Sequence, residues 1–122
     1  MAWFDGGDSD EGLVAVWYGP LVWGADADWT FQANIEDAWL GWSVANAGDT
    51  TGDGVDDLLV GAPYASDPED DEGKAFGFKG DGAGLADTPD WSAETDTDPG
   101  QLGWAVTGVG DVSCAGRDEF AV

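Results

Sequence analysis

Apolar positions along the chain fall into short runs separated by glycine-rich polar segments. Residues 13–18 are apolar and rich in β-branched and aromatic side chains, and the run ends at the turn signal Gly19-Pro20. Seven similar runs follow, and no helical period of apolar residues is sustained. The pattern therefore predicts an all-β chain whose strands lie at 13–18, 29–33, 42–47, 58–60, 74–78, 91–95, 104–109 and 120–122.

The chain contains an internal repeat. Leu40-Gly41-Trp42-Ser43-Val44 recurs from position 102 as Leu102-Gly103-Trp104-Ala105-Val106, and Asp10-Glu11-Gly12 recurs from position 71 as Asp71-Glu72-Gly73. We expect one segment over 1–122 made of two units, at about 12–72 and 73–122. Four short antiparallel strands per unit are typical of a β-propeller blade.

The charge of the chain is strongly negative. It has 26 Asp and Glu against Lys74, Lys79 and Arg117, for a net charge of −23. Nucleic acids and anionic membrane surfaces are therefore poor partners, because both attract Lys and Arg. No apolar run approaches the roughly 18 residues of a membrane span, so we expect no membrane insertion. The carboxylates, including the acidic run at 67–72, indicate either a solvated acidic surface, as in halophilic proteins, or cation sites.

Residue types that support much common chemistry are missing. The chain has no histidine, which excludes histidine general bases and metal ligands, and Cys114 is the single cysteine, which excludes an intrachain disulfide. No nucleophile, base and oxyanion donor occur together in a recognisable pattern. We therefore expect a binding protein and not an enzyme.

One loop carries a metal-binding pattern. In residues 49–57, oxygen-bearing side chains stand at positions 1, 3, 5 and 9, and Gly54 at position 6 permits a sharp turn. This spacing predicts a Ca²⁺ site, since calcium takes six to eight oxygen ligands. The expected ligands are the side chains of Asp49, Thr51, Asp53 and Asp57 and the backbone carbonyl of Val55.

The spacing of this loop is compatible with two other interpretations. An EF-hand requires a glutamate at position 12 and flanking helices, whereas position 12 here is Val60 within an apolar run. An acidic Asp-Gly turn without metal is the simpler alternative. The second unit has a degenerate copy with Asp111, Ser113, Arg117 and Glu119 at positions 1, 3, 7 and 9. Ala115 at position 5 offers no side-chain oxygen, so we expect this loop to bind calcium weakly or not at all.

Tryptophan is frequent, with eight residues. Four of them repeat with the unit and are expected to pack between blades: Trp29, Trp42, Trp91 and Trp104. Others, such as Trp23 and Trp39, do not repeat. They favour either core and interface packing or a sugar-stacking platform.

The stretch from Gly41 through the metal loop to Gly61-Ala62-Pro63 resembles the FG-GAP repeat, with Leu40-Gly41 in place of Phe-Gly. That repeat builds the β-propellers of integrin α-subunits and of many bacterial surface proteins. The resemblance implies a calcium-stabilised propeller with the ligands named above, and an extracellular or cell-surface location. A secretion signal would lie outside these 122 residues.

In that family the metal loop joins the first two strands of a blade. The chain would then hold one whole blade, at about 40–97, between two half-blades. The C-terminal half-blade at 102–122 could pair with the N-terminal half-blade at 13–33 of another copy, giving a ring or a filament. Three copies would make six blades and four would make eight. A longer parent chain is the alternative.

The function expected from these features is a structural or adhesive calcium-binding module, with a protein or glycan ligand that the sequence does not identify. Two alternatives stay open. One is a carbohydrate-binding propeller lectin, and the other is an accessory domain of a secreted hydrolase or lyase.

Overall fold

The structure is a computed structural model that describes residues 10–66 and 71–122, so most of the acidic run at 67–72 lies outside the described residues. Within these ranges the chain forms strands and no helix, and nothing in them could cross a membrane as a helix. The predicted all-β fold is confirmed. The strands are β1 (Val14–Val16), β2 (Trp29–Phe31), β3 (Ser43–Gly48), β4 (Asp57–Ala62), β5 (Lys74–Phe78), β6 (Trp91–Glu94), β7 (Thr107–Gly110) and β8 (Glu119–Ala121).

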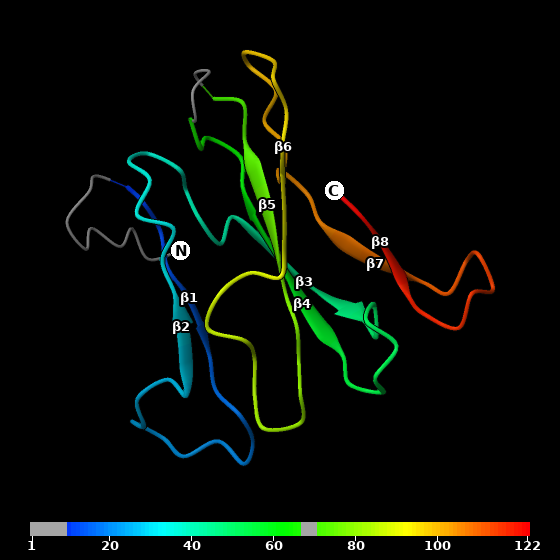
Figure 1. Ribbon diagram of the computed structural model, residues 1–122. Helices are drawn as coiled ribbons and strands as arrows, with labels where there is room; N and C mark the ends of the chain where they lie inside the picture. Colours follow the sequence, from blue (N-terminus) through cyan, green and yellow to red (C-terminus); the bar gives the residue numbers. More distant parts are fainter. Residues whose placement is uncertain (1–9, 67–70) are drawn as a thin grey trace.

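The strands form three antiparallel sheets that fan out side by side (Figure 1). We call β1–β2 the first half-blade, β3–β4–β5–β6 the full blade and β7–β8 the second half-blade. The loops β1–β2, β3–β4 and β5–β6 lie toward one end of the fan, and the segments that join successive sheets lie toward the other (Figure 1). The metal loop is the β3–β4 connection.

The strands that follow the two Gly-Trp motifs start later than predicted. Gly41 has φ +84°, and the Trp42 amide donates to the Trp39 carbonyl at 3.1 Å, so Trp42 belongs to a turn. Trp104 repeats this turn with Gln101, at 3.2 Å, and β7 begins at Thr107. In both motifs a glycine with positive φ interrupts the extended backbone just before the tryptophan. The apolar run by itself does not indicate this interruption, so the predicted strands start too early.

Successive sheets are joined by short parallel bridges that explain the repeated Glu-Gly pair. Gly12 bridges to Leu40, and Gly73 bridges to Leu102, whose amide donates to the Glu72 carbonyl at 3.1 Å. A Cβ added at Gly73 would lie 2.3 Å from the Leu102 nitrogen. Only glycine permits this approach of two backbones, so the repeat preserves it at both junctions.

The hydrophobic core lies between the first half-blade and the full blade. The Trp29 ring meets Phe78 edge-on at 5.0 Å, and Phe31 packs on Phe78 at 4.7 Å and on Phe76 at 5.5 Å. Val60 of β4 is buried in the same cluster. Edge-to-face aromatic pairs of this kind add about 0.5–1.5 kcal/mol each beyond the area that they bury.

The four repeated tryptophans do not share one environment. Trp29 is buried as predicted, whereas Trp104 makes the predicted contact between neighbouring sheets but is 48% exposed. Trp42 packs on Trp104 across the two neighbouring sheets, at 5.0 Å between ring centroids. Trp39 and Tyr64 complete this group of rings, which we call the aromatic group. It contacts both the full blade and the second half-blade.

Candidate metal centre

The loop from 49 to 57 folds as a compact turn around its first carboxylate. Asp49 accepts hydrogen bonds from the amides of Gly52 at 2.7 Å, Asp53 at 3.0 Å and Gly54 at 2.7 Å. Gly52 and Gly54 both have positive φ, at +78° and +88°, which turns their amides inward. A carboxylate that accepts several backbone amides holds a loop in one shape, since bonds to a charged acceptor are strong.

Asp57 closes the loop at the first residue of β4 and is buried. Its Oδ2 accepts the amide of Thr50 at 3.0 Å and the Thr50 hydroxyl. Its Oδ1 accepts the amide of Gly80 at 3.0 Å. The carboxylate thereby ties the metal loop to the β5–β6 loop of the same blade.

Asp53 is held from outside the loop by a lysine. Its Oδ2 lies 2.9 Å from the Lys79 ammonium, and its Oδ1 accepts the Val55 amide at 3.0 Å. The Lys79 ammonium is the main cause that lowers the pKa of the Asp53 carboxyl below its ordinary value, and the Asp53 carboxylate in turn raises the pKa of Lys79. Lys79 therefore already supplies positive charge to the loop.

The hydroxyl oxygen of Thr51 is buried with no hydrogen-bond partner in good geometry. It is close enough to Asp53 to contribute to the lowered pKa of that carboxyl, as the last of several causes. Buried polar atoms are normally paired, so an orphaned oxygen inside this turn is a position that a cation would satisfy. The donor set of carboxylates, hydroxyl and carbonyl oxygen suits a hard cation such as Ca²⁺.

The predicted ligands are all in one turn, but their carboxylates point to different partners. Among residues 10–66 and 71–122, no three acidic side chains form a cluster that could hold a metal ion. Asp49 faces backbone amides, Asp53 faces Lys79, and Asp57 faces Thr50 and Gly80. The residues fit calcium by their chemistry, and holding the ion requires some of these side chains to change partner.

The degenerate loop of the second half-blade repeats the same turn. Asp111 accepts the amides of Ala115 and Gly116, each at 2.8 Å, as Asp49 does in the first loop. Glu119 accepts the Val112 amide at 2.7 Å and the Ser113 hydroxyl. The Ser113 hydroxyl is the first cause that lowers the pKa of Glu119 below its ordinary value. The loop keeps its shape without a side-chain oxygen at position 5.

The two loops dock on each other. The Asp49 amide donates to the Asp118 carboxylate at 3.0 Å, and the Asp118 amide donates to the Asp49 carbonyl at 2.9 Å. The Arg117 side chain lies on Gly52, where an added Cβ would stand 3.2 Å from its Cγ and Nε. Arg117, predicted as a position of the second loop, thus also covers the first. The sequence analysis did not identify Asp118 as a contact of this loop, because the spacing of the loop residues does not point to it. It also did not identify Lys79, although Lys79 is one of only three basic residues in the chain.

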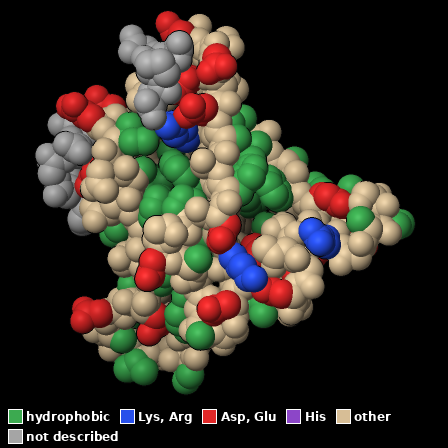
Figure 2. Space-filling view, viewed as in Figure 1, with side chains coloured by type: hydrophobic (Ala, Val, Ile, Leu, Met, Phe, Trp, Pro, Cys, Tyr) green, Lys and Arg blue, Asp and Glu red, His purple; other side chains and the backbone are tan. Residues whose placement is uncertain are grey.

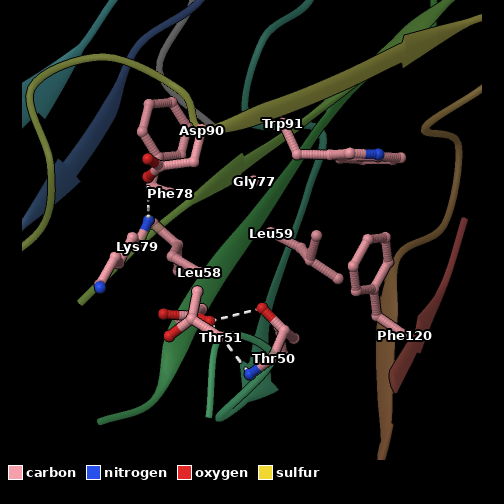
Figure 3. Close-up of a pocket in the computed structure, with 12 residues that line it drawn as sticks. Thr50, Thr51, Leu58, Leu59, Gly77, Phe78, Lys79, Asp90, Trp91 and Phe120 are labelled. Carbon is pink, nitrogen blue, oxygen red and sulfur yellow. Dashed lines mark hydrogen bonds between the residues drawn. The ribbon is translucent and has the colours of Figure 1, made fainter. Parts of the chain in front are cut away.

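A cavity of about 260 Å³ opens beside the metal loop, between the full blade and the second half-blade. Lys79 and Asp90 line one end of it, while Trp91, Leu59 and Phe120 line the other (Figure 3). The Trp91 and Phe120 rings meet edge-on at 4.8 Å. The apolar end is therefore built by β6 and β8 together.

Comparisons with known proteins agree with this architecture. The family model of the FG-GAP repeat matches residues 40–84, which include β3, β4, β5 and the metal loop. Integrin alpha-PS2 of Drosophila melanogaster is 37% identical to the chain over 94 residues. That match covers 69% of this chain and 6% of the integrin. The chain belongs to the FG-GAP repeat family, and its antiparallel sheets are built from the strands of β-propeller blades of the integrin α type.

Proposed function

We propose that this chain is a calcium-stabilised propeller module with an adhesive or structural role at the cell surface or outside the cell. We propose a binding role without catalysis. The observation that carries the calcium site is the orphaned Thr51 oxygen inside a turn whose other groups are also hard oxygen donors. Kinship with an integrin α-subunit supports the adhesive role and the location.

Calcium would be held by Asp49, Thr51, Asp53 and Asp57 together with the carbonyl of Val55. Bound there, the ion supplies positive charge and a link between the start and the end of the loop. Asp53 is the residue that must exchange partners, because its Oδ2 faces the Lys79 ammonium at 2.9 Å. Lys79 thus maintains the loop without metal and competes with the ion for the same carboxylate.

The charge of the chain also supports a role for cations. Acidic side chains are spread over the visible face of the molecule, and basic ones are few (Figure 2). A net charge of −23 on 122 residues repels itself, and bound divalent ions reduce that repulsion. Calcium should therefore stabilise the fold both through local ligation and through partial neutralisation of the acidic field.

The test is calcium titration by calorimetry, combined with thermal unfolding in calcium and in chelator. A ligand present at a hundred times its Kd stabilises the folded state by about 2.7 kcal/mol. For a domain of this size that corresponds to a Tm increase of roughly 10 °C. Magnesium serves as the control for general screening of charge.

Two matched variants separate ligation from bulk charge. Asp53→Ala removes a proposed ligand, whereas Asp56→Ala removes the same charge from an exposed neighbour outside the ligand pattern. We expect the calcium response to vanish in the first and to survive in the second. Equal loss in both variants, or a wild-type Tm that calcium does not change, would overturn the proposed site.

Carbohydrate binding is a second candidate function, and the aromatic group favours it. Its rings come from three segments, and Trp104 is about half exposed, as in a stacking surface for sugar rings. Glycan-array binding that is lost in Trp104→Ala would support this function. An array without binders for the wild-type chain would exclude the glycans tested.

A further inference from the structure

In the described structure, β1 and β8 are among the edge strands, and each lies in a sheet of only two strands. β1 pairs only with β2, and β8 pairs only with β7, whereas the four strands of the full blade pair in sequence. An open edge presents backbone donors and acceptors to any strand of matching shape. The internal repeat allows the matching strand to be identified.

The backbone registers fix which residues of the two units are equivalent. Trp29 lies opposite Val16, and Trp91 lies opposite Gly77. The Asp28 amide donates to the Val16 carbonyl at 3.0 Å, and the Asp90 amide donates to the Gly77 carbonyl at 2.9 Å. β1 is therefore the counterpart of β5, and β2 is the counterpart of β6.

The residues just after β1 and β5 are equivalent in the same way. The Tyr18 amide donates to the Asp28 carboxylate at 2.8 Å, and the Lys79 amide donates to the Asp90 carboxylate at 2.9 Å. Trp17, which precedes Tyr18, is consequently the counterpart of Phe78, which precedes Lys79. The repeat thus has an aromatic ring at this position in both units.

Within the chain, this aromatic position is buried against the preceding sheet. Phe78 is fully buried and Trp29 is 6% exposed, and their rings meet edge-on. The counterparts of these two residues are both exposed, Trp17 at 46% and Trp91 at 36%. Trp91 borders the open cavity between β6 and β8 (Figure 3). One chain therefore carries both halves of a contact that it makes internally only once.

We propose that β8 of one copy pairs antiparallel with β1 of a second copy and completes a four-stranded blade. The register follows from β4 and β5, where Leu58 lies opposite Phe78, Leu59 opposite Gly77 and Val60 opposite Phe76. The equivalent pairs between copies are Phe120 with Trp17, Ala121 with Val16 and Val122 with Ala15. The Trp17 indole then enters the cavity and packs on Trp91.

This interface contains fewer rings than its internal counterpart. Phe31 and Phe76 pack inside the chain, and the residues that correspond to them at the interface are Ala93 and Ala15. The contact between copies therefore depends mainly on Trp17, Trp91 and Phe120. Two chains that each carry a charge of −23 also repel each other, so salt should strengthen the association.

The proposal is tested by native mass spectrometry and light scattering over a range of protein concentrations, in high salt and without calcium, which separates it from the metal site. We expect oligomers of the whole chain. Trp17→Ala and Trp91→Ala should each raise the dissociation constant at least roughly 30-fold, as for a tryptophan at an interface centre. Trp23→Ala, at a fully exposed loop tip, is the matched control and should leave it unchanged.

The register is tested separately by disulfide cross-linking in a Cys114→Ser background. Val16→Cys with Ala121→Cys should give covalent oligomers, while Val16→Cys with Thr107→Cys should not. Circular dichroism of each variant separates loss of pairing from loss of folding. A monomer at every concentration, or equal weakening by Trp23→Ala and Trp17→Ala, would overturn the proposal. A monomer would leave a neighbouring blade of a longer chain as the occupant of both edges.

Discussion

Asp57→Asn is the substitution that examines the metal loop most directly. Asp57 is buried, and its two oxygens accept the Thr50 amide, the Thr50 hydroxyl and the Gly80 amide. Asparagine retains one acceptor oxygen and presents an NH₂ group to the donors on the other side. If the amide oxygen faces Thr50, the bond to Gly80 is lost. The bonds involve a charged acceptor, so we expect the free energy of unfolding to fall by about 2–3 kcal/mol.

The assay is urea unfolding in chelator, at fixed protein concentration, so that calcium does not contribute. That loss is a large part of the roughly 5–15 kcal/mol that stabilises a domain. Asp56→Asn is the control, because Asp56 is exposed and its carboxylate accepts only the Asn46 side-chain amide in the described structure. If the two variants unfold within about 0.5 kcal/mol of each other in chelator, the structural role assigned to Asp57 is wrong. In calcium, Asp57→Asn should also lose the stabilisation by the ion.

Two further predictions concern the backbone and the second loop. Gly73→Ala should destabilise the chain more than Gly82→Ala in the same urea assay. Both glycines have φ near +78°, a backbone conformation that costs alanine about 1–2 kcal/mol. Only Gly73 also lies against backbone atoms, because nothing approaches Gly82 within 4 Å. Equal losses would mean that the junction adapts freely. The folded-state pKa of Glu119 is below its ordinary 4.5, so its contribution to stability is present above pH 4.5 and is lost as pH falls through the folded pKa. Ser113→Ala should move this pKa upward in a carbon-13 NMR titration, and an unchanged value would show that the Ser113 hydroxyl is not the main cause.

Several features of the molecule could be predicted from sequence because they depend on neighbouring residues. The alternation of apolar runs and turns placed every strand to within a few residues, and β5 at its observed bounds. The spacing of Asp49, Asp53 and Gly54 indicated a tight turn, and the structure forms it through amides a few residues away. The repeat of Glu11-Gly12 and Glu72-Gly73 likewise indicated two equivalent units, although only the structure shows that each pair bridges to the next sheet.

Other features were decided only by the tertiary structure. Lys79 reaches Asp53 from a separate loop, and Asp118 reaches Asp49 from a separate sheet. Trp29 and Trp91 occupy the same position of the repeat, yet only Trp29 is buried, because only it has a neighbouring strand with Phe78 against it. Local sequence determines the conformation of a strand or a turn, since that depends on backbone and nearest neighbours. Burial, ion pairs and open edges depend on which distant segments meet, and only the folded chain brings those together.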